Sequence, residues 1–308
     1  MRRALAVVAA LSSCFLPACP ETPTIKSLTL DIDFATLRAD GKSFATITVI
    51  TDVEGDVFLT TERGKFETSG RSTVSVYSTG TASTRLKVCN ITQVGCFGTN
   101  VIKATTAEGL EATLEMTLTC PYSLVRQPLS TFETQDEGWR IVGDANSETP
   151  QGGDNGQVPE HDPEGGNPGG AVVATDLVTG GVWYWQSPAS FSGQWATQAG
   201  GTLSFDMYTT ATDGSLNARH PAVIIRGGGR SLHRVADADP ATNQWVRFEI
   251  PLTPAGGWKV GSMNGAPATD EDIAMALQCV GSLNIRGEYR TGPDSGSLDN
   301  VIFTPGAP

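Results

Sequence analysis

The predicted fold is decided by two stretches, GVWYWQSPASF at residues 181–191 and LNIRGEY at residues 283–289. In an extended strand Trp183 and Trp185 share one face, with Tyr184 on the other. Between the two stretches lie further strand-like runs separated by glycines. Short strands at regular spacing, with turn residues between them, predict an antiparallel β-sandwich.

The tryptophans divide the chain into two parts. All six lie within residues 128–305, and none lies within residues 25–121. Together with the Cys120–Pro121 junction, this shift in composition predicts two domains with those bounds. A chain of 308 residues is long enough for each domain to bury a core of its own.

Two segments of the second domain depart from the strand pattern. Residues 270–277 are predicted to be helical, with Thr269 as the N-cap and acidic residues in the first turn. Residues 146–170 consist mostly of Gly, Pro, Asp, Glu and Asn, so they bury little apolar area and are predicted to form a long exposed loop.

The first domain reads almost entirely as strands and turns. Residues 27–33 (SLTLDID) and 45–51 (ATITVIT) alternate apolar and polar side chains, and Asp40-Gly41 between them is a turn signal. Further strands are expected at residues 57–61, 73–77, 82–88 and 113–118. About seven short strands predict an all-β sandwich.

Short motifs of the first domain resemble the bacterial Ig-like domains of invasin and intimin. They are LRADG at residues 37–41, TERGKF at residues 61–66 and IKATT at residues 102–106. The resemblance implies an Ig-like β-sandwich that acts as a stiff stalk and holds a binding module away from the membrane.

The second domain resembles the laminin IV type A (laminin B) domain. WQSPASFSG at residues 185–193 fits the family's Ala-Pro-x-x-Phe-Leu-Gly element, with Ser187 where Ala is usual and Ser192 where Leu is usual. Residues 200–206, 253–259 and 283–289 fit later elements in the right order. The resemblance implies an extracellular binding module without catalytic activity. Its architecture is similar to the galactose-binding jelly roll of many carbohydrate-binding modules.

The first nineteen residues have the pattern of a secretion signal, with Arg2-Arg3 followed by the apolar residues 4–11. LPAC at residues 16–19 resembles the bacterial lipobox, which implies lipidation of Cys19. Cys14 is a second candidate, and an ordinary signal peptide is the alternative. Residues 20–24 (PETPT) then form a stiff tether.

The lipobox resemblance also predicts where the protein lies. Acyl chains on Cys19 would be its only contact with a membrane. No Asp follows Cys19, which by resemblance to Gram-negative lipoproteins favours the outer membrane or the cell surface.

Four cysteines remain after cleavage at Cys19, enough for two disulfides in an oxidising compartment. Cys89 and Cys96 flank a short polar segment, so we expect them to form a local bridge. Cys120 and Cys279 would then tie the first domain to the second. Three pairings are possible, and the sequence alone does not choose between them.

The candidate ligand-binding residues are tryptophans. Trp183 and Trp185 lie on one face of a strand, and we expect at least one of them in the core. Trp195 and Trp258 lie beside glycines at expected loop edges and are the better candidates for stacking on a sugar ring. Core packing is the alternative for all four. A net charge of −12 argues against a nucleic-acid partner.

The resemblance to jelly-roll binding modules also implies a structural calcium ion. In those modules the first and last strands are neighbours, and an acid from each often binds the metal. The matching residues here are Glu133 and Asp299. Carboxylate oxygens suit calcium, whereas solvated or strand-capping acids are the alternative.

The predicted function is non-catalytic adhesion to, or recognition of, an extracellular glycan or a matrix or surface protein. One alternative is a secreted glycosidase-type hydrolase that uses acids of the second domain. Another is a purely structural envelope protein. A protease is not favoured, because PDSGS at residues 293–297 has no histidine in a matching upstream motif.

Overall fold

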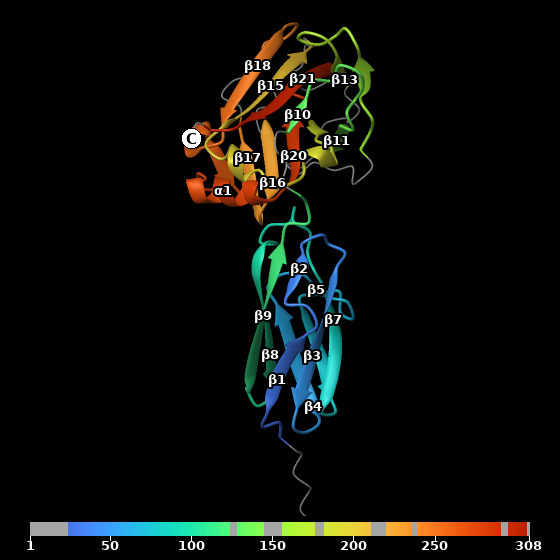
Figure 1. The fold of residues 1–308 in the computed structure, drawn as a ribbon, viewed down its shortest axis with the longest axis vertical. Helices are drawn as coiled ribbons and strands as arrows, with labels where there is room; N and C mark the ends of the chain where they lie inside the picture. Colours follow the sequence, from blue (N-terminus) through green and yellow to red (C-terminus); the bar gives the residue numbers. More distant parts are fainter. Residues whose placement is uncertain are drawn as a thin grey trace, which may run out of the picture.

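The computed structural model describes residues 24–123, 128–144, 156–175, 182–210, 220–235, 239–290 and 295–306. They form two β-sandwiches joined end to end (Figure 1). The predicted all-β fold is confirmed, and among these residues the single α-helix is α1 (Asp270–Gln278). Short 3₁₀ turns occur at η2 (Ala189–Phe191), η3 (Ala196–Gln198) and η4 (Pro254–Gly256).

The N-terminal sandwich packs a four-stranded sheet on a five-stranded one. The first sheet has the order β1 (Leu28–Ile32), β3 (Phe44–Thr51), β7 (Thr81–Lys87) and β5 (Lys65–Phe66). The second has the order β2 (Thr36–Arg38), β9 (Glu111–Thr119), β8 (Gly98–Thr106), β4 (Gly55–Thr61) and β6 (Thr73–Ser78). The pair β2–β9 is parallel and the other pairs are antiparallel.

The core between these sheets is formed by every second side chain of the long strands. Ile47 and Val49 of β3, and Val57 and Leu59 of β4, are fully buried, while their sequence neighbours point outward. The predicted turn at Asp40 and Gly41 is present: the Asp40 carboxylate accepts N–H bonds from the next turn residues. The structure adds β2 and β5, which are too short to show a period of their own.

The C-terminal sandwich consists of two six-stranded antiparallel sheets. One has the order β12 (Glu160–Asp162), β13 (Ala171–Thr175), β21 (Ser295–Thr304), β15 (Thr202–Thr209) and β18 (Trp245–Pro251), with β10 (Leu129–Ser130) also paired to β21. The other has the order β11 (Arg140–Asp144), β14 (Val182–Gln186), β20 (Val280–Arg286), β16 (Val223–Gly227), β17 (Arg230–Arg234) and β19 (Trp258–Val260).

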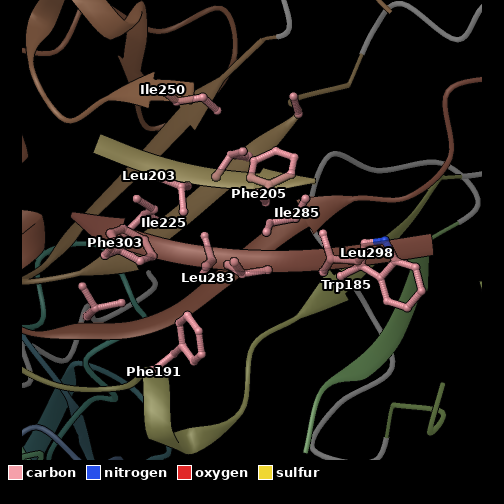
Figure 2. Close-up of a cluster of buried hydrophobic side chains, with 14 of the residues drawn as sticks. Trp185, Phe191, Leu203, Phe205, Ile225, Ile250, Leu283, Ile285, Leu298 and Phe303 are labelled. Atoms are coloured by element: carbon pink, nitrogen blue, oxygen red, sulfur yellow. The ribbon is translucent and has the colours of Figure 1, made fainter. Parts of the chain in front are cut away.

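The core of this sandwich lies between the two sheets and is rich in aromatic rings (Figure 2). Trp185 and Leu283 from one sheet and Phe205 and Phe303 from the other all belong to this core. The strand β12 corrects the predicted loop over residues 146–170, because Glu160–Asp162 pairs with β13. His161 lies in this strand, and its Nε2 is 2.7 Å from the carbonyl oxygen of Phe132.

The two sandwiches are joined by covalent and close backbone contacts. Both expected disulfides are present, and Cys120–Cys279 bridges residues 159 positions apart. The N–H of Gly95 donates to the carbonyl of Gly229 at 2.8 Å. Within the described part of the chain, no helix has the length and apolar character to cross a bilayer.

Candidate binding face of the C-terminal domain

The four tryptophans proposed as ligand contacts are all at most 1% exposed. Trp195 packs against Phe303 with ring centroids 4.0 Å apart. Trp258 lies in β19 on the core side, where its Nε1 donates to the Pro251 carbonyl at 2.8 Å. Neither is exposed at a loop edge as the sequence suggested, because both rings fill the interior of the sandwich.

Trp183 and Trp185 also face the core, with ring centroids 4.9 Å apart. Gly287 makes room for the first ring, since a Cβ at that position would lie 1.8 Å from Trp183 Cζ3. All four tryptophans are therefore packed in the core, which was the alternative to ligand binding, and none has an exposed ring face on which a sugar could stack.

The opposite face of the same sheet combines a small apolar cluster, formed by Val142, Val182, Tyr184 and Ile224, with several polar side chains. By strand parity it carries Tyr184 from β14, Asn284 and Arg286 from β20, Arg226 from β16, and His233 from β17. Tyr184 lies opposite Arg286, and the row Asn284, Ile224 and His233 crosses three neighbouring strands. We call the five polar residues among them, namely Tyr184, Arg226, His233, Asn284 and Arg286, the polar face.

The polar face is buried even though its side chains are hydrophilic. Tyr184 and Asn284 are fully buried, and Arg286 and His233 are 2% and 4% exposed. Arg226 donates to the Asn284 Oδ1 at 3.3 Å. Burial, reinforced by the charge of Arg226, lowers the pKa of His233 to about 4, so this imidazole is neutral at pH 7.

Two polar atoms of this face, Asn284 Nδ2 and His233 Nδ1, make no hydrogen bond to any of the described residues. A buried polar group without a partner costs about 1–3 kcal/mol, so each such position needs an explanation. Hydroxyl groups of a ligand would supply suitable partners. In residues 184–186 and 282–286, alternate side chains are polar, and this alternation could have predicted the polar face. The tryptophans considered as ligand contacts lie on the opposite face.

Of the predicted acidic pair, only Asp299 lies in a strand of the other sheet. Asp299 of β21 is fully buried and lies opposite Asp206 of β15, whereas Glu133 is exposed. Burial raises the pKa of Asp299 to about 6, and the charges of Asp206 and Glu133 add to the rise.

The hydrogen bonds around Asp299 bear on the calcium prediction. Its carboxylate oxygens already accept hydrogen bonds from Asn167 N at 2.7 Å, Asn300 N at 2.6 Å and Asn300 Nδ2 at 3.0 Å. The same Asn300 amide donates to Asp206 at 2.9 Å. No cluster of three metal-ligating side chains occurs among the described residues.

Protein N–H groups thus already donate to both Asp299 oxygens. Calcium at Glu133 and Asp299 stays a prediction. A rise in Tm with added calcium that Asp299→Asn abolishes would support it.

Comparisons with known proteins agree with the C-terminal architecture. Residues 184–308 match the family model of Laminin B (Domain IV). The basement membrane-specific heparan sulfate proteoglycan core protein of Mus musculus is 30% identical over 127 residues, which are 41% of this chain and 3% of that protein. The chain therefore spans a very small part of that relative. The C-terminal half contains a laminin-B-like domain.

Two solved structures are also similar. The L4b domain of human laminin alpha-2 covers 60% of this chain and 100% of its own, with 23% identity and a TM-score of 0.43. A beta-glucuronidase from glycoside hydrolase family 2 covers 90% of this chain and 30% of its own, with 13% identity and a TM-score of 0.26.

Proposed function

We propose that this chain is a non-catalytic adhesion or recognition protein of the cell exterior. The laminin-B-like domain supports an extracellular adhesive or structural role. In this proposal the N-terminal sandwich is the Ig-like stalk and the C-terminal sandwich is the binding head. The end-to-end arrangement supports that division (Figure 1).

The proposal includes a lipid anchor on Cys19, which places the protein at the outer membrane or the cell surface. Cys19 and its lipobox precede the first described residue. The anchor would be tested by metabolic labelling with a fatty acid, which Cys19→Ala should abolish if Cys14 does not take its place.

The polar face is the proposed contact for the ligand, and an extracellular glycan is the partner that its chemistry favours. Because these side chains are buried, binding in this proposal requires the segments that cover them to move aside. The observation that carries this proposal is the pair of buried atoms, Asn284 Nδ2 and His233 Nδ1, that have no hydrogen-bond partner in the part of the chain that the structure describes. Sugar hydroxyls both donate and accept hydrogen bonds, so they match a face that mixes amide, imidazole and guanidinium groups.

The proposal is tested with the double variant Asn284→Leu/His233→Leu on a glycan array. Asn284→Leu removes the acceptor of Arg226, and His233→Leu removes the group that lies 2.8 Å from Ser231 Oγ, so the double variant should lose stability. We expect it to lose its glycan signal at a temperature where circular dichroism shows that it is still folded. Thr84→Val is the matched control, because Thr84 Oγ1 is a buried atom without a partner in the other sandwich.

Three outcomes contradict the proposal. Equal glycan binding by the wild type and the double variant would exclude the polar face. The absence of any soluble ligand would favour a purely structural envelope protein. Turnover in a parallel glycosidase screen, abolished by replacing one acid of the C-terminal domain, would show the hydrolase alternative.

A further inference from the structure

A second candidate site lies in the N-terminal sandwich, apart from the polar face. A hollow of about 360 Å³ opens beside β5, β7 and the turn that precedes β3. Three lysines line it, namely Lys42 from the turn, Lys65 from β5 and Lys87 from β7, and all three are exposed. This gathering of cations stands out in a chain whose net charge is −12.

The lysine charges are not neutralised by neighbouring acids. Within the described structure none of the three ammonium groups forms a salt bridge. The nearby Glu67 pairs with Arg85 at 3.0 Å. The hollow contains one acid, Asp40, and its carboxylate is occupied by its own turn, with bonds of 2.7–2.8 Å from Lys42 N, Ser43 N and Ser43 Oγ.

Two of the lysines oppose each other directly. Lys65 and Lys87 are cross-strand partners in the β5–β7 pair. Like charges in this position destabilise a sheet, so the pair has a cost in the free protein. An anion between the two ammonium groups would remove that cost and gain two charge-assisted hydrogen bonds.

The remaining wall of the hollow is suited to a polar ligand. Asn90 and Gln93 line it with side-chain amides, and the Cys89–Cys96 disulfide closes the loop that carries them. Apart from Val88 and the Cys89 residue of the disulfide, the lining is polar, charged or glycine, and it includes no aromatic ring. Single-stranded nucleic acids are bound by stacking on aromatic rings, so the lining favours a hydroxyl-rich anion over a nucleic acid.

We propose that this hollow binds an acidic sugar unit of an extracellular polysaccharide. Lys65 and Lys87 would contact its carboxylate from two sides, Lys42 would add a third positive charge, and the amides of Asn90 and Gln93 would contact its hydroxyls. The site belongs to the stalk and is independent of the ligand proposed for the head.

The test is calorimetric titration of the exported full chain with oligogalacturonate, and with a neutral galactose oligomer of the same length. We expect the acidic oligomer to bind in a salt-dependent manner and the neutral one to bind much more weakly. Lys65→Gln/Lys87→Gln should weaken acidic binding about tenfold, because two exposed charge contacts are lost. The same variant should have a higher Tm than the wild type without ligand, since the opposed charges are gone.

The matched control is Lys26→Gln/Lys103→Gln, which changes the net charge equally outside the hollow. It should leave the affinity within twofold of the wild type. If the control variant loses as much affinity for oligogalacturonate, the effect comes from net charge alone and the proposed site is wrong. Failure of the acidic oligomer to bind would overturn it too. So would binding of anionic lipid vesicles through Lys65 and Lys87 without any binding of oligogalacturonate.

Discussion

Asp299 and His233 are buried titratable residues whose pKa values are displaced from their ordinary range, one upward and one downward. The folded protein keeps Asp299 protonated up to about pH 6, where the unfolded chain has already released that proton. It keeps His233 neutral down to about pH 4, where the unfolded chain has already taken up a proton. The two effects on stability therefore have opposite signs in one pH window.

For Asp299 the free energy of unfolding should fall as pH rises. Below pH 4 the carboxyl is protonated in both states, and above about pH 6 it is charged in both. Across that window the folded state loses about 3 kcal/mol relative to a chain without this group. We expect Asp299→Asn to lack this slope, so its stability relative to the wild type should improve between pH 4 and pH 7. Urea unfolding in calcium-free buffer measures this, and identical slopes would contradict it.

For His233 the sign is reversed. Between about pH 6.5 and pH 4 the unfolded chain binds a proton that the folded chain does not. Stability conferred by the neutral imidazole is therefore lost as pH falls, by about 3 kcal/mol. His233→Leu should be less sensitive to acid than the wild type in the same urea measurement. Equal losses of stability in both proteins between pH 7 and pH 4 would contradict the buried, neutral state.

Among the elements, α1 is stabilised by a capping box at its N-terminus. Thr269 Oγ1 accepts from Asp272 N at 3.1 Å, and Asp272 in turn accepts from Thr269 N. The loss of such a cap costs about 1 kcal/mol, so we expect Thr269→Ala to lower the free energy of unfolding by that amount. Thr269→Ser retains the hydroxyl and should remain within a few tenths of a kcal/mol of the wild type. Equal stability of the two variants in urea unfolding would show that the cap is not formed.

The same element shows what the sequence could predict. The helix at Asp270–Gln278 and its cap followed from local signals, as did the long alternating strands β3 and β15. The short strands β5 and β12 did not, because two or three residues show no period and their pairing depends on distant partners. For β14 the sequence predicted which residues share a face. It did not predict which of the two faces packs against the core, because that depends on the other sheet.

The candidate sites, like the strands, could be predicted from the sequence only in part. Glu133 and Asp299 were expected to approach each other, and in the structure the charge of Glu133 acts on Asp299. The polar face and the lysine hollow were not foreseen, because each combines strands that are far apart in sequence. Lys65 and Lys87, for example, become partners only when β5 joins β7.

At the scale of the whole molecule, the orientation of one sandwich on the other is set by a tight junction. A Cβ at Gly281 would lie 2.7 Å from Cγ2 of Thr92 in the other sandwich, and Ser123 accepts from Gln194 N at 3.3 Å. The Cys120–Cys279 disulfide links the end of the first sandwich to the strand region of the second. A stalk that presents a head in one direction needs such a junction, because small inter-domain interfaces otherwise permit relative motion.

Removal of that disulfide should therefore loosen the junction. Cys120→Ala/Cys279→Ala removes a crosslink between residues 159 positions apart, together with two sulfur atoms at the edge of the N-terminal core. Native disulfides stabilise by about 2–5 kcal/mol, mainly by restricting the unfolded chain, so we expect a lower Tm. Small-angle X-ray scattering should show a broader range of inter-domain arrangements than in the wild type. Thr84→Val is the control, because Thr84 lies in β7 and makes none of these junction contacts, and it should leave the scattering curve nearly unchanged. If the first variant matches the wild type in scattering, the glycine-lined contacts alone hold the head in place.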